Sequence, residues 1–203
     1  MLVKWITCRA ADRAAFDRGQ RAWAGLRGIP GFLGQAGGWS GNAADIAQIF
    51  GFWSDQSSYQ TFMDRAHDRI AAAQTATFDE LQVRLFQHRL DIGDGFPSDL
   101  STVSLLRLAH CRVRERGQVH FVRSQADVWN PGMAASHGMR GGVFAQRGDS
   151  EFLVLSAWRT AHDHQRYRDE IFGSLYARAG HAVDLESVAG DVVGLVPDWT
   201  VPG

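Results

Sequence analysis

The sequence predicts an α+β protein built from two tandem repeats, each with the element order βαββαβ. The first observation behind this is a strand of aromatic and branched residues, Ile46–Trp53, which is followed by helix-capping residues and an amphipathic helix. The second is that the same arrangement returns at Phe152–Trp158. The third is a set of similar residues that recur 105 positions apart, namely Phe16/Phe121, Gln20/Gln125, Trp39/Phe144, Trp53/Trp158, Gln60/Gln165 and Phe62/Tyr167. A spacing shared by so many pairs indicates a duplicated unit.

The first repeat is expected to span residues 1–88. Its expected elements are a strand Leu2–Cys8, a helix from Asp12 to Leu26, strands Phe32–Trp39 and Ile46–Trp53, a helix to about Gln74 and a strand Leu81–Phe86. Gly34, Gly37 and Gly38 in the second strand predict a bulge or a close approach of another backbone.

A connector is expected over residues 89–102, and the second repeat over residues 103–203. The expected elements of this repeat are a strand Val103–Val113, a helix Gln118–Trp129, a loop from Asn130 to Met139, strands Gly142–Gln146 and Phe152–Trp158, a helix to about Ala179 and terminal strands through Val201. In the first strands of the repeats the spacing is 103, which aligns Lys4 with Arg107 and Cys8 with Cys111.

The central strand of each repeat is apolar on both faces. In Ile46–Trp53 only Gln48 is polar, whereas a strand with one wet face should alternate apolar and polar residues. Helices can cover one face of each sheet, so we expect the two sheets to cover each other's second face. The expected fold is an intrachain α+β barrel made of two ferredoxin-like halves, a pseudo-dimer within one chain.

The composition argues against several classes of partner. The formal net charge of the 203-residue chain is -1, which gives no electrostatic basis for binding nucleic acid or an anionic membrane. No segment approaches the roughly 20 apolar residues of a transmembrane helix, and the N-terminus shows no signal-peptide pattern, so a cytoplasmic location is expected. Cys8 and Cys111 are expected to be small buried apolar side chains.

The sequence resembles the dimeric α+β barrel superfamily, which includes the antibiotic-biosynthesis monooxygenases, and more narrowly the uncharacterised YdbC-like bacterial proteins. The segments that carry this resemblance are Lys4–Ile6 with Cys8, Gln20–Trp23, Gly31–Gln35, Gly37–Trp39, Phe62–Met63, His67–Asp68, His110–Cys111, Glu151–Trp158 and Pro197–Val201. The resemblance implies the tandem barrel architecture. It implies no particular activity, because the superfamily spans very different functions.

No cofactor or metal is expected. Heme-degrading members of the superfamily carry a tryptophan at the position of Phe62 or Tyr167 and a ligating histidine at that of Ala72 or Ala177, and this chain lacks both residue types there. The sequence contains no zinc-type cluster, HExxH, GxSxG, P-loop or GxGxxG motif.

Gln20 and Gln125 are the most informative polar residues. Gln125 falls between Phe121 and Val128 on the apolar face of its helix, and Gln20 occupies the matching place in the first repeat. A buried amide needs hydrogen-bond partners. It can bind a neighbouring strand or helix end, or it can line a ligand pocket between helix and sheet.

Aromatic and imidazole side chains supply further candidates in both halves. Trp53 and Trp158 end equivalent strands, where a tryptophan is either core or the wall of a pocket, as it is in monooxygenases of the superfamily. His67 lies at the margin of an apolar stripe beside Asp68, where it can act as an acid or base or belong to a polar network.

His164 and Arg168 lie close together on the second helix of the second repeat. His164 falls between Tyr167 and Leu175 on the inner face, so the pair is a candidate site for an anionic or carbonyl-bearing ligand. Together with Gln125 they predict that the second half holds the principal ligand site.

Two classes of function remain. One is a cofactor-independent, monooxygenase-like enzyme that acts on an apolar or aromatic substrate. The other is a non-catalytic ligand-binding or stress-response module that uses the same cavity. In both cases the expected partner is a small molecule, with neither nucleic acid nor membrane, and a homodimer of chains is compatible with the pseudo-dimer. No catalytic residue can be assigned.

Overall fold

The computed structural model describes residues 1–74 and 77–203, and the chain divides into two compact units. Unit 1 comprises Met1–Leu85, Pro97–Ser101 and Val193–Gly203, and unit 2 comprises Phe86–Phe96 and Thr102–Val192. The units are not the same as the sequence repeats, because the end of the second repeat belongs to unit 1.

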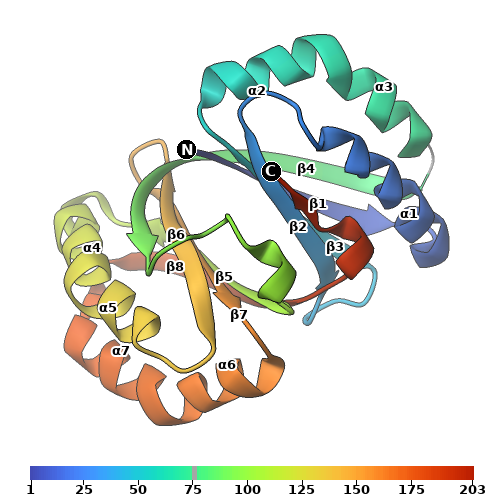
Figure 1. Cartoon of the computed structure of the whole chain (residues 1–203). Helices are drawn as coiled ribbons and strands as arrows, with labels where there is room; N and C mark the ends of the chain where they lie inside the picture. The colour runs from blue at the N-terminus through green and yellow to red at the C-terminus, as the bar shows by residue number, and fades with distance from the viewer. Residues whose placement is uncertain (75–76) are drawn as a thin grey trace. The chain divides into compact units, whose positions relative to one another are not determined.

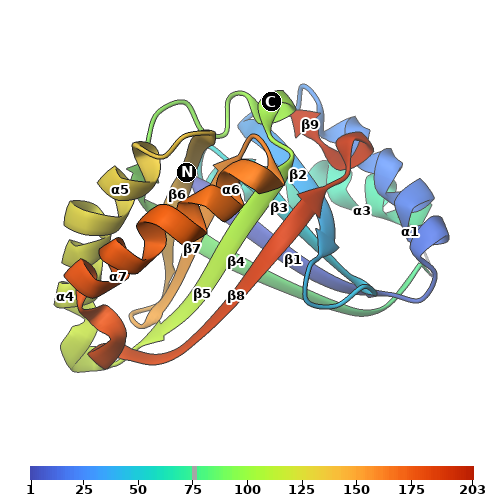
Figure 2. The same ribbon diagram turned by 90° about the horizontal axis from the view of Figure 1, so that it is seen from below.

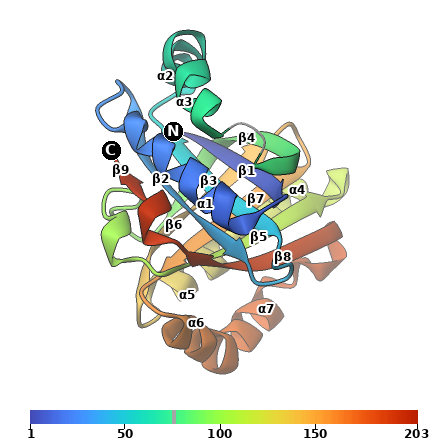
Figure 3. The same cartoon turned by 90° about the vertical axis from the view of Figure 1, so that its right-hand side faces the viewer.

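The sheet of unit 1 is formed by strands β1 (Leu2–Ala10), β2 (Phe32–Ser40) and β3 (Ile46–Trp53) with the first part of β4 (Phe78–Ile92). Its strand order is β4-β1-β3-β2, and β2 also pairs with the end of β8 and with β9 (Val201–Pro202). Figure 3 shows β9 beside β2, near the C-terminus.

The helices of unit 1 follow β1 and β3 and lie along one side of its sheet (Figure 1). Helix α1 (Arg13–Gln20) begins at Asp12, whose carboxylate accepts the backbone N–H groups of Ala14 and Ala15, and it continues as a 3-10 segment to Leu26. Helix α2 (Gln56–Phe62) passes through a π-helical turn at 63–67 into α3 (Asp68–Ala71).

The sheet of unit 2 has the order β4-β6-β7-β5-β8 and repeats this design. Its own strands are β5 (Leu105–Val113), β6 (Met139–Arg147), β7 (Glu151–Trp158) and β8 (Leu185–Leu195). Along one side of it run α4 (Gln118–Ser124), a π-helical turn at 125–129, α5 (Asn130–Ala134), α6 (Ala161–Tyr167), a second π-helical turn at 168–172 and α7 (Gly173–Ala179), as Figure 2 shows.

The duplication extends to individual contacts. Asp55 and Thr160 cap α2 and α6 through side-chain oxygens that accept a backbone N–H three residues later. On these helices Gln60 donates to Asp64 at 2.8 Å, and Gln165 donates to Asp169 at 2.9 Å. The indoles that end the preceding strands stack in the same way, because Trp53 lies 4.9 Å from the Phe62 ring and Trp158 lies 4.9 Å from the Tyr167 ring.

One pair in the spacing argument was wrong. In unit 1, Trp39 of β2 pairs with Ala47 of β3. The residue of β7 that is equivalent to Ala47 is Phe152, and it pairs with Gln146 of β6. Trp39 therefore corresponds to Gln146, two positions beyond Phe144. The registers of both strands shift near their starts, at Phe32/Gly34 and Met139/Gly142.

Two elements also differ from the expected boundaries. The expected loop after Trp129 begins as helix α5, which continues directly from the preceding π-helical turn. Strand β4 continues to Ile92, into the segment expected to be a connector, where its residues pair with β6.

The glycines of β2 behave as expected. Gly34 has a φ of 143° and lies at the bulge. A Cβ atom on Gly38 would lie 1.9 Å from the carbonyl oxygen of Gly194, so only glycine allows this approach of β2 to β8.

The strand pairing confirms the predicted fold class. Strands β4 and β8 belong to both sheets, and β2 pairs with β3, so the order of paired strands returns to its starting point. This is the connectivity of an intrachain α+β barrel. Almost every residue of β3 and β7 is buried, which agrees with strands covered on both faces.

Both cysteines are free and buried, as expected. No helix among the described residues is long and apolar enough to cross a membrane. Nor do the described His, Cys, Asp and Glu side chains form a group of three or more that could hold a metal ion.

Trp199 tests the contribution of the C-terminal segment to unit 1. Its indole is fully buried, contacts the rings of Phe16 and Trp39, and donates to Asp17 at 2.8 Å. We expect Trp199→Ala to lower the free energy of unfolding by about 3–5 kcal/mol and Trp199→Phe, which keeps a ring, by less. Urea denaturation measures this, with Val188→Ala at an exposed position as the control. Equal stability of all variants would contradict this role.

Candidate functional site

Unit 2 contains a cavity of about 280 Å³ between its sheet and its helices. The side chains that surround it are mostly aromatic and aliphatic, with a few polar groups among them. The lining residues are Arg107, Ala109, Cys111, Phe121, Gln125, Trp129, Met133, Val154, Phe172, Tyr176, His181, Leu185, Val188 and Gly190. An apolar cavity with a small number of polar groups is the usual form of a small-molecule site.

Strand alternation places three of the lining residues. Arg107, Ala109 and Cys111 follow one another at every second position of β5, so they share one face of that strand. Ala109 pairs with Val154 of β7. In unit 1 the equivalent pair is Ile6 and Ile49. The smaller side chains in unit 2 leave space that the two isoleucines occupy in unit 1.

Gln125 both forms a hydrogen bond to a neighbouring element and lines the cavity, which are the two alternatives that its sequence position suggested. It begins the π-helical turn after α4, is 3% exposed and lines the cavity. Its amide nitrogen donates to Asn130 Oδ1 at 2.6 Å, and Asn130 in turn donates to the Asp91 carbonyl at 2.8 Å. This chain of hydrogen bonds holds the amide at the wall of the cavity.

His181 is a buried neutral imidazole at the same cavity. Burial lowers its pKa below the ordinary value. The indole N–H of Trp129 donates to His181 Nδ1 at 3.0 Å, and an indole nitrogen can only donate. The proton of the neutral ring is therefore on Nε2, and the ring offers a donor rather than a free basic nitrogen.

Arg107 is the only charged residue among the lining side chains. Burial lowers its pKa, and its guanidinium lies 5.7 Å from the Phe172 ring centre. Within the described part of the chain it forms no hydrogen bond and no ion pair. In the sequence Arg107 was notable only as the residue that aligns with Lys4 of the first repeat. The feature that could have identified it as a site residue is that it is a lone arginine on an otherwise apolar face of a buried strand.

His164 and Trp158 pack against each other next to Tyr167. Burial lowers the pKa of His164 to about 4, with the charge of Arg107 as a smaller cause. His164 Nε2 and Tyr167 Oη are both buried without a hydrogen-bond partner in the described structure. Trp158 donates its indole N–H to Ser156 at 3.0 Å.

The predicted second-half group is thus only partly brought together. Gln125 lines the cavity, whereas Trp158, His164 and Arg168 are not among its lining residues. Arg168 is exposed. His164 and Arg168 are nevertheless close enough to Arg107 to interact with it electrostatically.

In unit 1 the predicted residues form a polar and aromatic cluster. Gln20 accepts a hydrogen bond from Gln74 at 2.8 Å, and Gln74 accepts one from the Trp23 indole at 2.8 Å. His67 lies 5.8 Å from the Trp23 ring and 2.9 Å from Asp68. Gln20 thus forms a hydrogen bond with a residue at a helix end, which is one of the two interpretations given for it. Trp53 packs among Phe32, Tyr59 and Phe62 in the core.

Lys4 is the unit 1 counterpart of Arg107, and it is the only lysine in the sequence. Across their sheets Lys4 pairs with Gly51 and Arg107 with Ser156, which are equivalent positions. Lys4 is 7% exposed, and its ammonium lies 5.9 Å from the Trp23 ring and 5.3 Å from the Tyr59 ring. Burial lowers its pKa to about 8.

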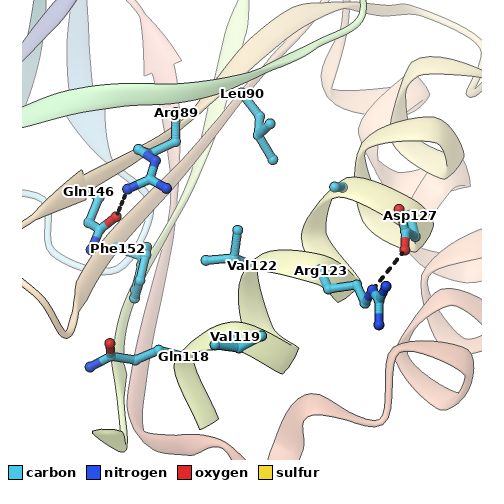
Figure 4. Close-up of a pocket in the computed structure, with 10 residues that line it drawn as sticks. Arg89, Leu90, Gln118, Val119, Val122, Arg123, Asp127, Gln146 and Phe152 are labelled. Atoms are coloured by element: carbon cyan, nitrogen blue, oxygen red, sulfur yellow. Dashed lines mark hydrogen bonds and ion pairs between the residues drawn. The ribbon is translucent and has the colours of Figure 1, made fainter.

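A second, wider pocket of about 560 Å³ opens along α4 and β4 in unit 2 (Figure 4). Leu90, Val122 and Phe152 face this groove, and Val119 on its rim is 83% exposed. Its polar side chains pair with one another: Arg89 donates to Gln146 at 2.6 Å, and Arg123 lies 3.8 Å from Asp127. The narrower cavity of about 280 Å³, with its unpaired cation, is the stronger candidate site.

The fold and the cavity place the chain in a class of α+β barrels with solved structures. A proposed monooxygenase from Lactobacillus acidophilus NCFM is 12% identical with a TM-score of 0.77, over 99% of this chain and 95% of that one. Another, from Fusobacterium nucleatum subsp. nucleatum ATCC 25586, is 7% identical with a TM-score of 0.79, over 96% of this chain and 91% of that one. At these identities the likeness concerns the fold.

The sequence relatives are more specific. Residues 2–86 match the family described as Domain of unknown function (DUF4937). The chain is also 38% identical over 74 residues to the uncharacterized protein YdbC of Bacillus subtilis (strain 168), a match that covers 34% of this chain and 62% of YdbC. The resemblance to YdbC-like and monooxygenase-like proteins is thereby confirmed, with the family match confined to the first repeat.

Lys4 provides a direct test of burial in unit 1. Since there is one lysine, protein labelled with 15N at lysine Nζ gives one side-chain signal, and we expect it to titrate near pH 8. Between about pH 8 and 10.5 Lys4 binds more protons in the unfolded chain than in the folded chain, so its own contribution to stability should rise with pH, while the raised pKa values of Cys8 and Cys111 act in the opposite direction above about pH 9. The Lys4 contribution is therefore the difference in the free energy of unfolding between wild type and Lys4→Met, which should shift in favour of the wild type as the pH rises. Titration near 10.5 would show that the amine is solvated.

Proposed function

We propose that the protein binds a small, flat, largely apolar molecule in the cavity of unit 2. The observation that carries the proposal is the cavity itself, with the rings of Phe121, Trp129 and Phe172 in its walls and a positioned amide at Gln125. Aromatic walls favour an aromatic ligand, because stacked and edge-on ring contacts add to the burial of apolar surface. The equivalent isoleucines of unit 1 support an assignment to the second half.

The finer proposal is a monooxygenase-like reaction without a bound cofactor, in which the substrate itself supplies the electrons. Its support is the likeness of fold to proposed monooxygenases. The cavity would contribute binding and orientation. At neutral pH it offers no strong base: His181 uses Nδ1 to accept from Trp129, and burial raises the pKa of the Cys111 thiol to about 12. A substrate that must lose a proton would have to be acidic on its own.

Filling the cavity tests the binding proposal. Ala109→Ile gives unit 2 the side chain that unit 1 has at the equivalent position. We expect it to weaken binding of 2-naphthamide by about tenfold or more, because an overfilled site costs about 1–3 kcal/mol. Quenching of tryptophan fluorescence or calorimetry measures the affinity. Val119→Ile, on the open groove, is the matched control and should bind as the wild type does. Equal affinity of wild type and Ala109→Ile would refute the assignment.

Oxygen uptake separates the two classes of function. Wild-type protein and Ala109→Ile are compared in an oxygen electrode with a series of hydroxynaphthalenes that bind the wild type. Uptake that exceeds the uncatalysed rate and falls in Ala109→Ile supports the enzyme. Binding without additional uptake supports the non-catalytic ligand-binding module.

A further inference from the structure

The charge of Arg107 has no counter-charge in the structure. A buried ion is stable only if it is paired or hydrogen-bonded, because removing it from water costs several kcal/mol. Arg107 is half-buried at the cavity and, among the described residues, its side chain forms neither an ion pair nor a hydrogen bond. The lining residues include no aspartate or glutamate.

The groups close to Arg107 are neutral or carry the same charge. Burial raises the pKa of both the Cys111 thiol and the Tyr167 phenol to about 12, so both are protonated at neutral pH. His164, with its pKa lowered to about 4, is neutral. Arg168 adds a second positive charge. None of these groups can compensate the guanidinium.

Two buried polar atoms near this cation also lack partners. They are His164 Nε2 and Tyr167 Oη, on side chains that are 4% and 2% exposed. Native proteins pair nearly all such atoms, so an unpaired group needs an explanation. Neither side chain lines the cavity, so the ligand is not expected to pair with either atom.

The comparison with unit 1 shows why the need for an external counter-charge is confined to unit 2. Lys4 occupies the equivalent position, and an amine in a buried site can lose its proton. A guanidinium remains charged at any physiological pH. Lys4 lies against two aromatic rings and loses its proton about one pH unit above neutral, whereas the Arg107 guanidinium keeps its charge.

We infer that the ligand of the unit 2 cavity carries an anionic oxygen on a flat aromatic frame, and that Arg107 binds this oxygen. The inference rests on the proposed function, since it concerns the same cavity. Carboxylates and ionised phenols share the required chemistry: an oxygen that accepts from the planar N–H fork of arginine. The aromatic frame would lie against Trp129 and Phe172.

The test compares probes that differ only in charge. The dissociation constants of 2-naphthoate and neutral 2-naphthamide are measured at pH 7.5 by calorimetry, and an acidic nitrophenol in its ionised form distinguishes phenolate from carboxylate recognition. We expect the wild type to prefer the naphthoate by about 10- to 100-fold, the range for a hydrogen bond to a charged group. Arg107→Gln should remove this preference, and Arg123→Gln, an exposed arginine on α4, should retain it.

The outcomes separate the two proposals. Equal binding of both probes to the wild type, or a preference that survives Arg107→Gln, would overturn the inference and leave the proposed function intact. If neither probe bound, both would fail. Thermal unfolding supplies a second readout: removal of an unpaired buried charge should leave the ligand-free Arg107→Gln protein at least as stable as the wild type. A lower melting temperature together with an unchanged preference would show that Arg107 is structural.

Discussion

A positive charge placed beneath the helices is the constraint that shapes both units. Both repeats begin with a strand that carries a cation at the same position, Lys4 in one and Arg107 in the other. Each cation faces the side of its sheet that the helices cover. Lys4 lies against the rings of Trp23 and Tyr59, whereas Arg107 lies beside the cavity of unit 2 and, among the described residues, its side chain has no counter-charge.

The two units show how one scaffold can carry side chains of different volume at equivalent positions. The elements that hold the helices in place are the same in both, down to the caps at Asp55 and Thr160 and the indole at the end of each central strand. What differs is the volume of side chains above the first strand. Isoleucines in unit 1 are replaced by Ala109 and Val154 in unit 2, where the cavity lies. Duplication thus permits the two halves to differ in side-chain volume while the scaffold stays the same.

Much of the fold could be predicted from the sequence because the strong signals were local and repeated. Strand β3 was predicted at its observed bounds, and the bulge at Gly34 followed from glycine in a strand. The failures came from non-local causes. The extent of β4 depends on pairing with β6, and helix α5 forms although an Asn-Pro-Gly sequence favours a loop. No local sequence pattern predicts the pairing of β4 with β6 or the packing that allows α5 to form.

The candidate site was less predictable, since it depends on what surrounds a residue. Gln125 was found because an amide on an apolar helix face is conspicuous in a helical projection. Arg107 was missed as a site residue, because only the burial of its neighbours shows that it lacks a counter-charge. His164 was correctly placed on the inner face, yet its buried ring packs against Trp158 and is not among the residues that line the cavity.

The most direct measurement is a crystal structure of the protein in complex with 2-naphthoate. We expect the ring system between Trp129 and Phe172, with the carboxylate within hydrogen-bond distance of the Arg107 guanidinium. A carboxylate that points to solvent, or a ligand bound in the open groove beside Val119 with the cavity empty, would contradict it.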